Sequence, residues 1–340
     1  RKIEVMHMSK IAIDVMGGDN APDEIIKGCI KASKEVDSTL VLVGPEVLIK
    51  EKLSAFTYEP SKIEIVDAEE VIEMEESPTL AIRQKKKSSM VIGLKLLKEG
   101  QVDGFMSAGS TGALLTGATL IVGRIKGVER PALAPFIPTQ KGCSLLIDCG
   151  ANVDAKPSYL AQFARMGTVY MQQCMAVPNP KVGLINIGVE AEKGNQLVKD
   201  AYKLLSADES INFLGNIEAR DIPKGEADIL VCDGFVGNVV LKFMEGFAKW
   251  ILGMLKIEFF RNLKTKVAAL LLKKGVYNIK GKFDYATKGG APFLGVNGLV
   301  VKTHGSSKAE EVYSTIIQTE GFIKSQLVEK IKMNFTETAN

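Results

Sequence analysis

The sequence lacks most features that mark secreted, membrane-spanning or nucleotide-binding proteins. Its five cysteines are odd in number and form no C-x-x-C pair, which favours buried, reduced thiols in a cytosol over a disulfide framework. The one long uncharged run, 104–123, contains five glycines and five serines or threonines, so it is a poor membrane span. No G-x-G-x-x-G or Walker loop is present, which weakens a dinucleotide or ATP interpretation.

The sequence also lacks any change in composition that would mark a domain boundary. The 340 residues are 46% apolar and 24% charged, which is ordinary for a globular protein. No repeat, low-complexity tract or long linker marks a boundary, so we expect one α/β unit over 8–340 rather than two closely joined lobes. Residues 1–7 precede a Met-Ser-Lys start and lack an apolar core like that of a signal peptide, so we interpret them as a leader or an expression remnant.

Net charge is small but unevenly distributed. The chain carries a net charge of +3, yet residues 240–290 hold eleven lysines and arginines against three acidic residues. Apolar clusters alternate with these lysines, which predicts a basic amphipathic helical segment over 238–290. Such a segment can lie on an anionic membrane, pair with a sister chain, or form an ordinary dimer helix with a solvated cationic face. We expect no nucleic-acid partner.

Short β-branched runs alternate with segments of helical period, the pattern of a mostly parallel, doubly wound α/β fold. The expected strands are 10–16, 39–44, 62–67, 102–106, 143–150, 181–188, 211–216, 227–234 and 299–305. The expected helices are 22–36, 78–99, 111–126, 157–175, 195–205, 238–256 and 307–333.

Several expected strands end in a polar residue beside glycine. Because ligands of open parallel sheets bind beyond the carboxyl ends of strands, these positions predict a shared polar crevice, although each alone could simply form a turn. The segments concerned are Asp148-Cys149-Gly150, Asn186-Ile187-Gly188, Gly215-Asn216, Asp233-Gly234 and His304-Gly305.

Two glycine-rich loops follow early strands. In DVMGGDNAP (14–22), Gly17 and Gly18 let the backbone approach a ligand, and Asp19 or Asn20 is expected to cap the next helix. In SAGSTGAL (107–114), Ser110 and Thr111 can cap a helix or bond a phosphate. A tightly packed, capped helix explains the second loop equally well, but two such loops together indicate phosphate chemistry.

Taken together, these segments resemble the bacterial phosphate acyltransferases of phospholipid synthesis, the PlsX family. The matching stretches span nearly the whole chain in order and include VIEMEESPTLAIRQKKKSSM, GRIKGVERPALAP, LIDCGANVDAKP, GLINIGVEAEKGN and ILVCDGFVGNV. The resemblance implies a three-layer α/β/α fold like that of isocitrate and isopropylmalate dehydrogenases, a homodimer, and loose association with the inner membrane face. It implies transfer of a long-chain acyl group from acyl carrier protein to inorganic phosphate, giving acyl phosphate.

This chemistry needs an oriented anion and a stabilised oxyanion rather than a strong acid, because a thiolate with pKa near ~8.5 leaves readily. No cofactor or metal is expected. Lys193 can hold phosphate as a point charge, and the Asn238 amide can reach the carbonyl oxygen. The resemblance assigns catalysis to these two residues; taken alone, Lys193 could be a solvated lysine and Asn238 a helix cap.

The remaining candidates are the loop and strand-end residues expected to contact phosphate or substrate. His304 could donate to phosphate, act as a base or satisfy a turn carbonyl, and we place it among binding candidates only. The binding candidates are Gly17, Gly18, Asp19, Ser110, Thr111, Asn152, Asn186, Gly194, Asn195, Asp233, His304 and Ser306.

Three other functions fit parts of the sequence. A phosphotransacetylase using coenzyme A would share the phosphate loops without needing a basic docking face. An oxidoreductase on the same fold would normally need an acidic metal cluster, which we cannot place. A non-catalytic membrane scaffold would explain the basic segment but not the glycine loops. The basic segment and Lys85-Lys86-Lys87 both suit an acidic carrier protein.

Overall fold

The computed structural model describes residues 8–287 and 289–337, with the side chains of 277–280, 282–287 and 337 left out. The expected leader 1–7, Lys288 and the side chains of Lys280 and Lys282 therefore lie outside the described residues. By its internal contacts the chain divides into two compact units. Unit 1 comprises Arg1–Leu133, Val169–Val177 and Lys288–Asn340, and unit 2 comprises Ala134–Thr168 and Pro178–Thr287.

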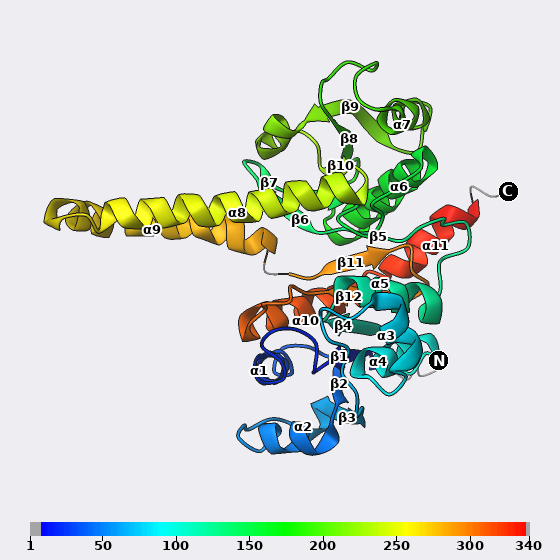
Figure 1. Cartoon of the computed structure of the whole chain (residues 1–340), viewed down its shortest axis with the longest axis vertical. Coiled ribbons are helices and arrows are strands. Elements are labelled where there is room, and N and C mark those ends of the chain that lie inside the picture. The colour runs from blue at the N-terminus through cyan, green and yellow to red at the C-terminus, as the bar shows by residue number, and fades with distance from the viewer. Residues whose placement is uncertain (1–7, 288, 338–340) are drawn as a thin grey trace, which may run out of the picture. The chain divides into compact units, whose positions relative to one another are not determined.

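Unit 1 is built on a seven-stranded sheet of order β3-β2-β1-β4-β12-β11-β5 (Figure 1). The strands from β3 to β12 are parallel, and β11 is antiparallel to both of its neighbours. They are β1 (Lys10–Asp14), β2 (Thr39–Gly44), β3 (Ile63–Asp67), β4 (Gly104–Ser107), β5 (Ala132–Leu133), β11 (Ala291–Leu294) and β12 (Leu299–Lys302). β2 is buried at every position, as its unbroken apolar run predicts.

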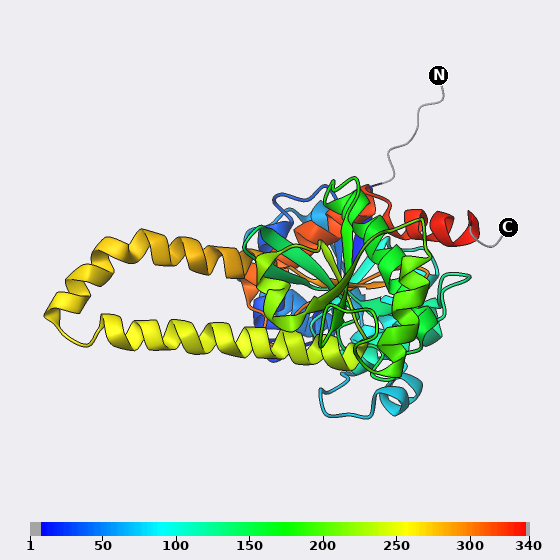
Figure 2. The same cartoon turned by 90° about the horizontal axis from the view of Figure 1, so that it is seen from above.

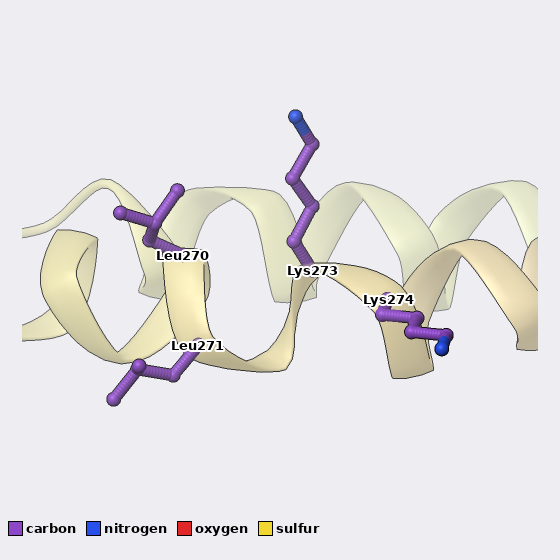
Figure 3. Close-up of a pocket in the computed structure, with 4 residues that line it drawn as sticks. All are labelled: Leu270, Leu271, Lys273 and Lys274. Atoms are coloured by element: carbon purple, nitrogen blue, oxygen red, sulfur yellow. The ribbon is translucent and has the colours of Figure 1, made fainter.

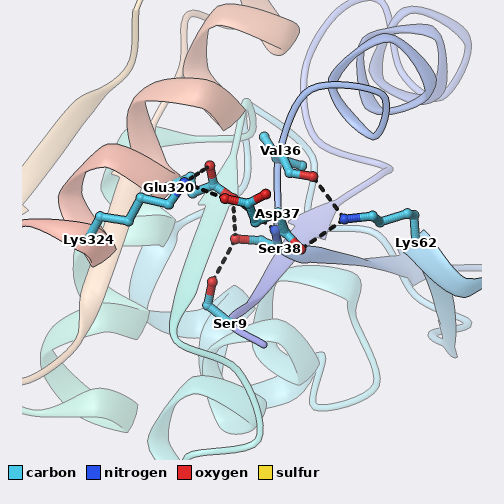
Figure 4. Close-up of polar contacts among 7 residues, drawn as sticks. All are labelled: Ser9, Val36, Asp37, Ser38, Lys62, Glu320 and Lys324. Carbon is cyan, nitrogen blue, oxygen red and sulfur yellow. Dashed lines mark hydrogen bonds and ion pairs between the residues drawn. The ribbon is translucent and has the colours of Figure 1, made fainter. Parts of the chain in front are cut away.

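Helices pack against this sheet, and one polar network ties α10 to the turn before β2. The Glu320 carboxylate accepts hydrogen bonds from Ser38 N (2.8 Å), Ser38 Oγ (2.7 Å) and Lys324 Nζ (2.8 Å; Figure 4). The helices of unit 1 are α1 (Asp23–Ala32), α2 (Glu46–Leu53), α3 (Pro78–Gln84), α4 (Ser89–Lys98), α5 (Thr111–Gly117), α10 (Ala309–Lys324) and α11 (Leu327–Glu337). A π-helical turn, Ala118–Val122, extends α5.

Unit 2 is built on a five-stranded sheet of order β6-β7-β10-β8-β9, in which only β6 is antiparallel to its neighbour. Its strands are β6 (Phe136–Thr139), β7 (Gly142–Ile147), β8 (Lys181–Asn186), β9 (Asn212–Glu218) and β10 (Ile229–Val231). Its helices are α7 (Gln196–Ser206), α8 (Gly234–Phe259) and α9 (Leu263–Thr287), together with the first two thirds of α6 (Pro157–Cys174).

The basic segment forms a helical hairpin, α8 followed by α9 (Figures 1 and 2). Its apolar side chains are largely exposed, with Phe243 at 69% and Leu271 at 81%. A hollow at α9 is lined by Leu270, Leu271, Lys273 and Lys274, so apolar and cationic side chains lie next to one another on this helix (Figure 3). Within the described residues, no helix combines the length and apolarity needed to cross a bilayer.

The sequence misplaces several boundaries. The helix expected over 78–99 is two helices, because Ser88 leaves the helix, accepts a hydrogen bond from Val91 N and so begins α4. Gly215-Asn216, expected at a strand end, lies inside β9. The short strands β5, β6 and β11 and the helix α2 are absent from the prediction, while the mostly parallel α/β pattern is confirmed.

Candidate functional site

The two residues with expected catalytic roles come from neighbouring strands of unit 2. Lys193 lies in the loop that follows β8, and Asn238 lies in the second turn of α8, the helix that follows β10. Because β10 pairs in parallel with β8, both segments start from the same edge of the sheet. Both side chains are exposed, and no hydrogen bond or ion pair within the described residues engages the Lys193 ammonium or the Asn238 amide.

Two asparagines hydrogen-bond the backbone of the loop that contains Lys193. Asn186, the last residue of β8, donates to Lys193 O (3.1 Å), and buried Asn216 donates to Glu190 O (2.8 Å). Gly194 has φ +92°, and a Cβ there would lie 2.4 Å from Asn186 Oδ1, so only glycine fits. Asn195 then caps α7 by accepting a hydrogen bond from Val198 N (3.0 Å).

Asn238 is not a helix cap. Asp233 caps α8 instead, accepting from Val236 N at 2.8 Å, so the helix begins four residues earlier than expected. Asn152 lies in the loop after β7, where its side-chain amide donates to Asp148 Oδ2 (2.9 Å). The Asn186, Asn195, Asp233 and Asn152 side chains thus all have structural hydrogen bonds.

In unit 1 the corresponding edge is organised around Asp14, which the sequence analysis missed. This carboxylate accepts from Ser89 Oγ (2.6 Å), Ser107 Oγ (2.6 Å) and Met16 N (3.2 Å). Burial raises its pKa, although these hydrogen bonds act in the opposite direction. The chain runs from β1 outward to β3 and returns to β4 on the other side of β1, so Asp14 and Ser107 end the strands at a topological switch point.

The first glycine loop is tightly packed in this edge. A Cβ on Gly17 would lie 2.6 Å from Asp14 Oδ2, and Gly18 has φ +99° with Gly305 O within 2.8 Å of the Cβ position. Asp19 N donates to Gly305 O (2.8 Å). The expected cap by Asp19 or Asn20 is wrong: Pro22 occupies the N-cap of α1, while Asn20 Nδ2 donates to Ser306 O (3.0 Å).

The second glycine loop and the end of β12 complete the unit 1 edge. Ser110 caps α5, which is one of the two roles that its sequence position allows, and Thr111 is the first residue of this helix. Ser306 N donates to His304 Nδ1 (3.2 Å), and Ser306 Oγ lies 2.8 Å from the same ring nitrogen. Lys302, only 8% exposed, donates to Ala108 O (3.2 Å) and to Thr303 O, which places a cation at the loop without any sequence signal beyond its position at a strand end.

The predicted site residues thus form two groups, each on the carboxyl edge of one sheet. Unit 1 brings together Gly17, Gly18, Asp19, Ser110, Thr111, His304 and Ser306. Unit 2 brings together Asn152, Asn186, Lys193, Gly194, Asn195, Asp233 and Asn238. Sequence reasoning missed Asp14 and Lys302, and it placed Asn216 at a strand end rather than inside β9; a polar residue buried at the end of a strand is the signal that could have marked the first two.

Residues 9–330 match the model of a family described as fatty acid synthesis protein. The phosphate acyltransferase of Clostridium perfringens strain SM101 is 51% identical over 329 residues, covering 96% of this chain and 97% of that protein. The phosphate acyltransferase of Clostridium beijerinckii is 52% identical, covering 96% and 99%. The chain belongs to the phosphate acyltransferase family, PlsX. The chain is therefore an acyltransferase, and the name of its family indicates that phosphate is a substrate.

Solved structures place the PlsX chain in the expected fold class. A phosphotransacetylase from Streptococcus pyogenes superposes with a TM-score of 0.64 at 18% identity, covering 95% of this chain and 94% of that one. A 4-hydroxythreonine-4-phosphate dehydrogenase from Salmonella typhimurium gives 0.54 at 13% identity, covering 92% and 99%. The expected α/β/α architecture, shared by transacylases and dehydrogenases, is confirmed.

Proposed function

We propose that this enzyme moves a long-chain acyl group from acyl-acyl carrier protein to inorganic phosphate, giving acyl phosphate for the synthesis of phosphatidic acid. One observation carries the proposal: Lys193 and Asn238 follow the parallel strands β8 and β10 at one edge of the sheet, and neither side chain is hydrogen-bonded within the described residues. An exposed cation and an exposed amide donor are what the transfer of an acyl group to an anion requires.

In the proposed reaction, a phosphate oxygen attacks the thioester carbonyl carbon while the Lys193 ammonium holds the anion. Asn238 Nδ2 donates to the carbonyl oxygen as it becomes negative, an interaction worth roughly 2.7–4 kcal/mol for one well-aimed donor. The C–S bond then breaks, its electron pair leaves with the sulfur, and the thiolate takes a proton from water. The products are acyl phosphate and the free thiol of the carrier.

Apolar side chains beside these two residues support a long acyl chain. Ile187 and Val189, in the Lys193 loop, are 80% and 61% exposed. Phe235 and Val239, on the first turns of α8, are 62% and 52% exposed. Exposed apolar groups next to a polar reaction site fit the binding of a fatty acyl chain better than that of an acetyl group.

The hairpin α8–α9 is our proposed contact surface for macromolecular partners. Its lysines suit the acidic carrier protein, and its exposed apolar residues suit an anionic membrane face, peripheral binding and a homodimer. The other basic run is less suitable, because Lys85 pairs with Glu76 and Lys87 with Glu69. The unit 1 loops remain proposed phosphate-binding elements, although Gly17 N and Asp19 N already have acceptors within the protein.

The decisive experiment measures free carrier protein released from its long-chain thioester, with and without added orthophosphate. We expect release that depends on phosphate, together with acyl phosphate as product. Release that ignores phosphate would contradict the proposal. Faster turnover of acetyl coenzyme A than of the carrier thioester would instead indicate a phosphotransacetylase.

A further inference from the structure

We propose that Asp148 and Asn152 are positioning residues that hold the start of α8, and with it Asn238, in the orientation that acyl transfer requires. The inference rests on the proposed function, in which Asn238 stabilises the oxyanion. Neither residue needs to touch substrate for this role. Asn152 thereby loses the phosphate-binding role that its place in the sequence suggests.

The Asp148 carboxylate organises the loop that follows β7. Asp148 is fully buried, with 0% of its surface exposed. Its Oδ1 accepts from Cys149 N (2.6 Å) and Ala151 N (3.2 Å), and its Oδ2 accepts from Asn152 N (2.6 Å) and Asn152 Nδ2 (2.9 Å). Hydrogen bonds to a charged acceptor are about twice as strong as neutral ones, so four of them fix the loop firmly.

The backbone of this loop contacts the backbone of α8 at two glycines. Asn152 O accepts from Gly234 N at 2.7 Å, and a Cβ on Gly234 would lie 2.8 Å from Asp148 Oδ2. A Cβ on Gly237 would lie 1.9 Å from Asp148 O, closer than any real contact. The helix backbone therefore rests directly on the loop backbone, and only glycine allows this approach.

Asn238 follows Gly237, so a shift of the loop changes its position directly. The loop also approaches Asn238 itself, since a Cβ on Gly150 would lie 3.8 Å from Asn238 Cγ. A misplacement of about 1 Å in a reacting group can lower the rate by roughly 10²-fold. A shift of the loop can therefore lower the rate of acyl transfer without any contact between the loop and the substrate.

The main test is Asp148→Asn. Each oxygen of Asp148 accepts two hydrogen bonds, so the new NH₂ group would face two donors in either orientation and the loop must rearrange. We expect kcat to fall by roughly 10²-fold, while KM for phosphate, which depends on Lys193, stays within about twofold of wild type. Unchanged kcat, or a rise in KM for phosphate with kcat intact, would overturn the proposal.

Asp208→Asn is the matched control. The Asp208 side chain is 7% exposed, belongs to the same unit and accepts from Arg165 Nε (2.6 Å) and Ser210 Oγ (2.6 Å). It lies after α7, away from the first turns of α8. Its substitution should lower stability with kcat close to wild type, which separates positioning from a general loss of buried hydrogen bonds.

Combining Asp148→Asn with Asn238→Ala separates this inference from the proposed function. If Asp148 acts through Asn238, its substitution costs no further activity once Asn238 is alanine. Losses that multiply would overturn the positioning role and leave the role of Asn238 intact. Full activity of Asn238→Ala alone would instead contradict the proposed function.

Asn152→Ala covers the case in which Asp148→Asn does not fold. It removes the 2.9 Å hydrogen bond from Asn152 Nδ2 to Asp148 Oδ2 and keeps both the Asp148 carboxylate and the backbone bond to Gly234. We expect kcat to fall roughly tenfold with KM for phosphate unchanged. A raised KM for phosphate with normal kcat would make Asn152 a phosphate ligand and overturn the proposal.

Discussion

The carboxyl edges of the two sheets carry similar residue types but use them differently. In unit 1, Asp14, Ser89 and Ser107 are buried and bond to one another. In unit 2, buried Asp148 and Asn186 likewise bond within their loops, but the side chains of Lys193, in the loop after β8, and of Asn238, on α8, make no hydrogen bond within the described residues. Polar residues after a strand thus indicate a reaction site only where some of their side chains are not already hydrogen-bonded within the protein.

The largest expected effect is on the oxyanion donor. Asn238→Ala should fold normally and lose 10²–10³-fold in kcat, the roughly expected cost of one such donor. Ser107→Ala in unit 1 should lower stability, because it removes one of the two buried hydroxyl donors to Asp14, while kcat stays near wild type. Steady-state kinetics and urea unfolding of both variants check the contrast, and equal losses of kcat would break it.

The next largest effect is expected from neutralising one lysine cluster in each unit. Lys273→Gln with Lys274→Gln, on the hairpin of unit 2, should slow association of the acidic carrier by roughly tenfold at low salt. Added salt should reduce the difference. Lys85→Gln with Lys87→Gln in unit 1 should change the rate less, because Glu76 and Glu69 already balance these charges. Stopped-flow association rates measure this, and the opposite ranking would place docking on unit 1.

The tight packing of the unit 1 loop gives a smaller effect, on stability. Gly18→Ala must adopt φ +99° and place its Cβ 2.8 Å from Gly305 O. Gly123→Ala has a similar φ of +92° but open space around it, so it pays only the backbone cost of about 1–3 kcal/mol. Urea titrations should show the greater loss of unfolding free energy for Gly18→Ala. Equal losses would mean that the loop is not tightly packed.

The smallest expected effect concerns pH. Burial alone would raise the pKa of Glu320, but hydrogen bonds from Lys324 and Ser38 outweigh it and hold this pKa below its usual 4.5. A carboxyl with a lowered pKa stabilises the fold above its unfolded pKa, and that stability is lost as pH falls through the folded value. Glu320→Gln should therefore lose less stability between pH 7 and acid than wild type. Parallel curves of urea midpoint against pH would contradict this.

Most of the sheet could be predicted because strands covered on both faces must be apolar throughout, as in β2. β5 and β11 were missed because they have only two and four residues, too few for a periodic signal, and they pair with each other across a long stretch of sequence. Lys193 and Asn238 were identified by residue type and resemblance. The role of Asp148 depends on the contact between its loop and α8, which the order of residues does not reveal. The burial of Asp14 depends on hydrogen bonds from Ser89 and Ser107, which are distant in sequence.

If unit 2 carries out the chemistry, phosphate is held by Lys193, and the dependence of rate on orthophosphate concentration tests this most directly. Wild type and Lys199→Ala, which removes a lysine of α7, should saturate with the same KM for phosphate. Lys193→Ala should remain folded and lose at least about 10²-fold in kcat/KM for phosphate. A Lys193→Ala enzyme that saturates with phosphate as wild type does would show that the anion is held elsewhere.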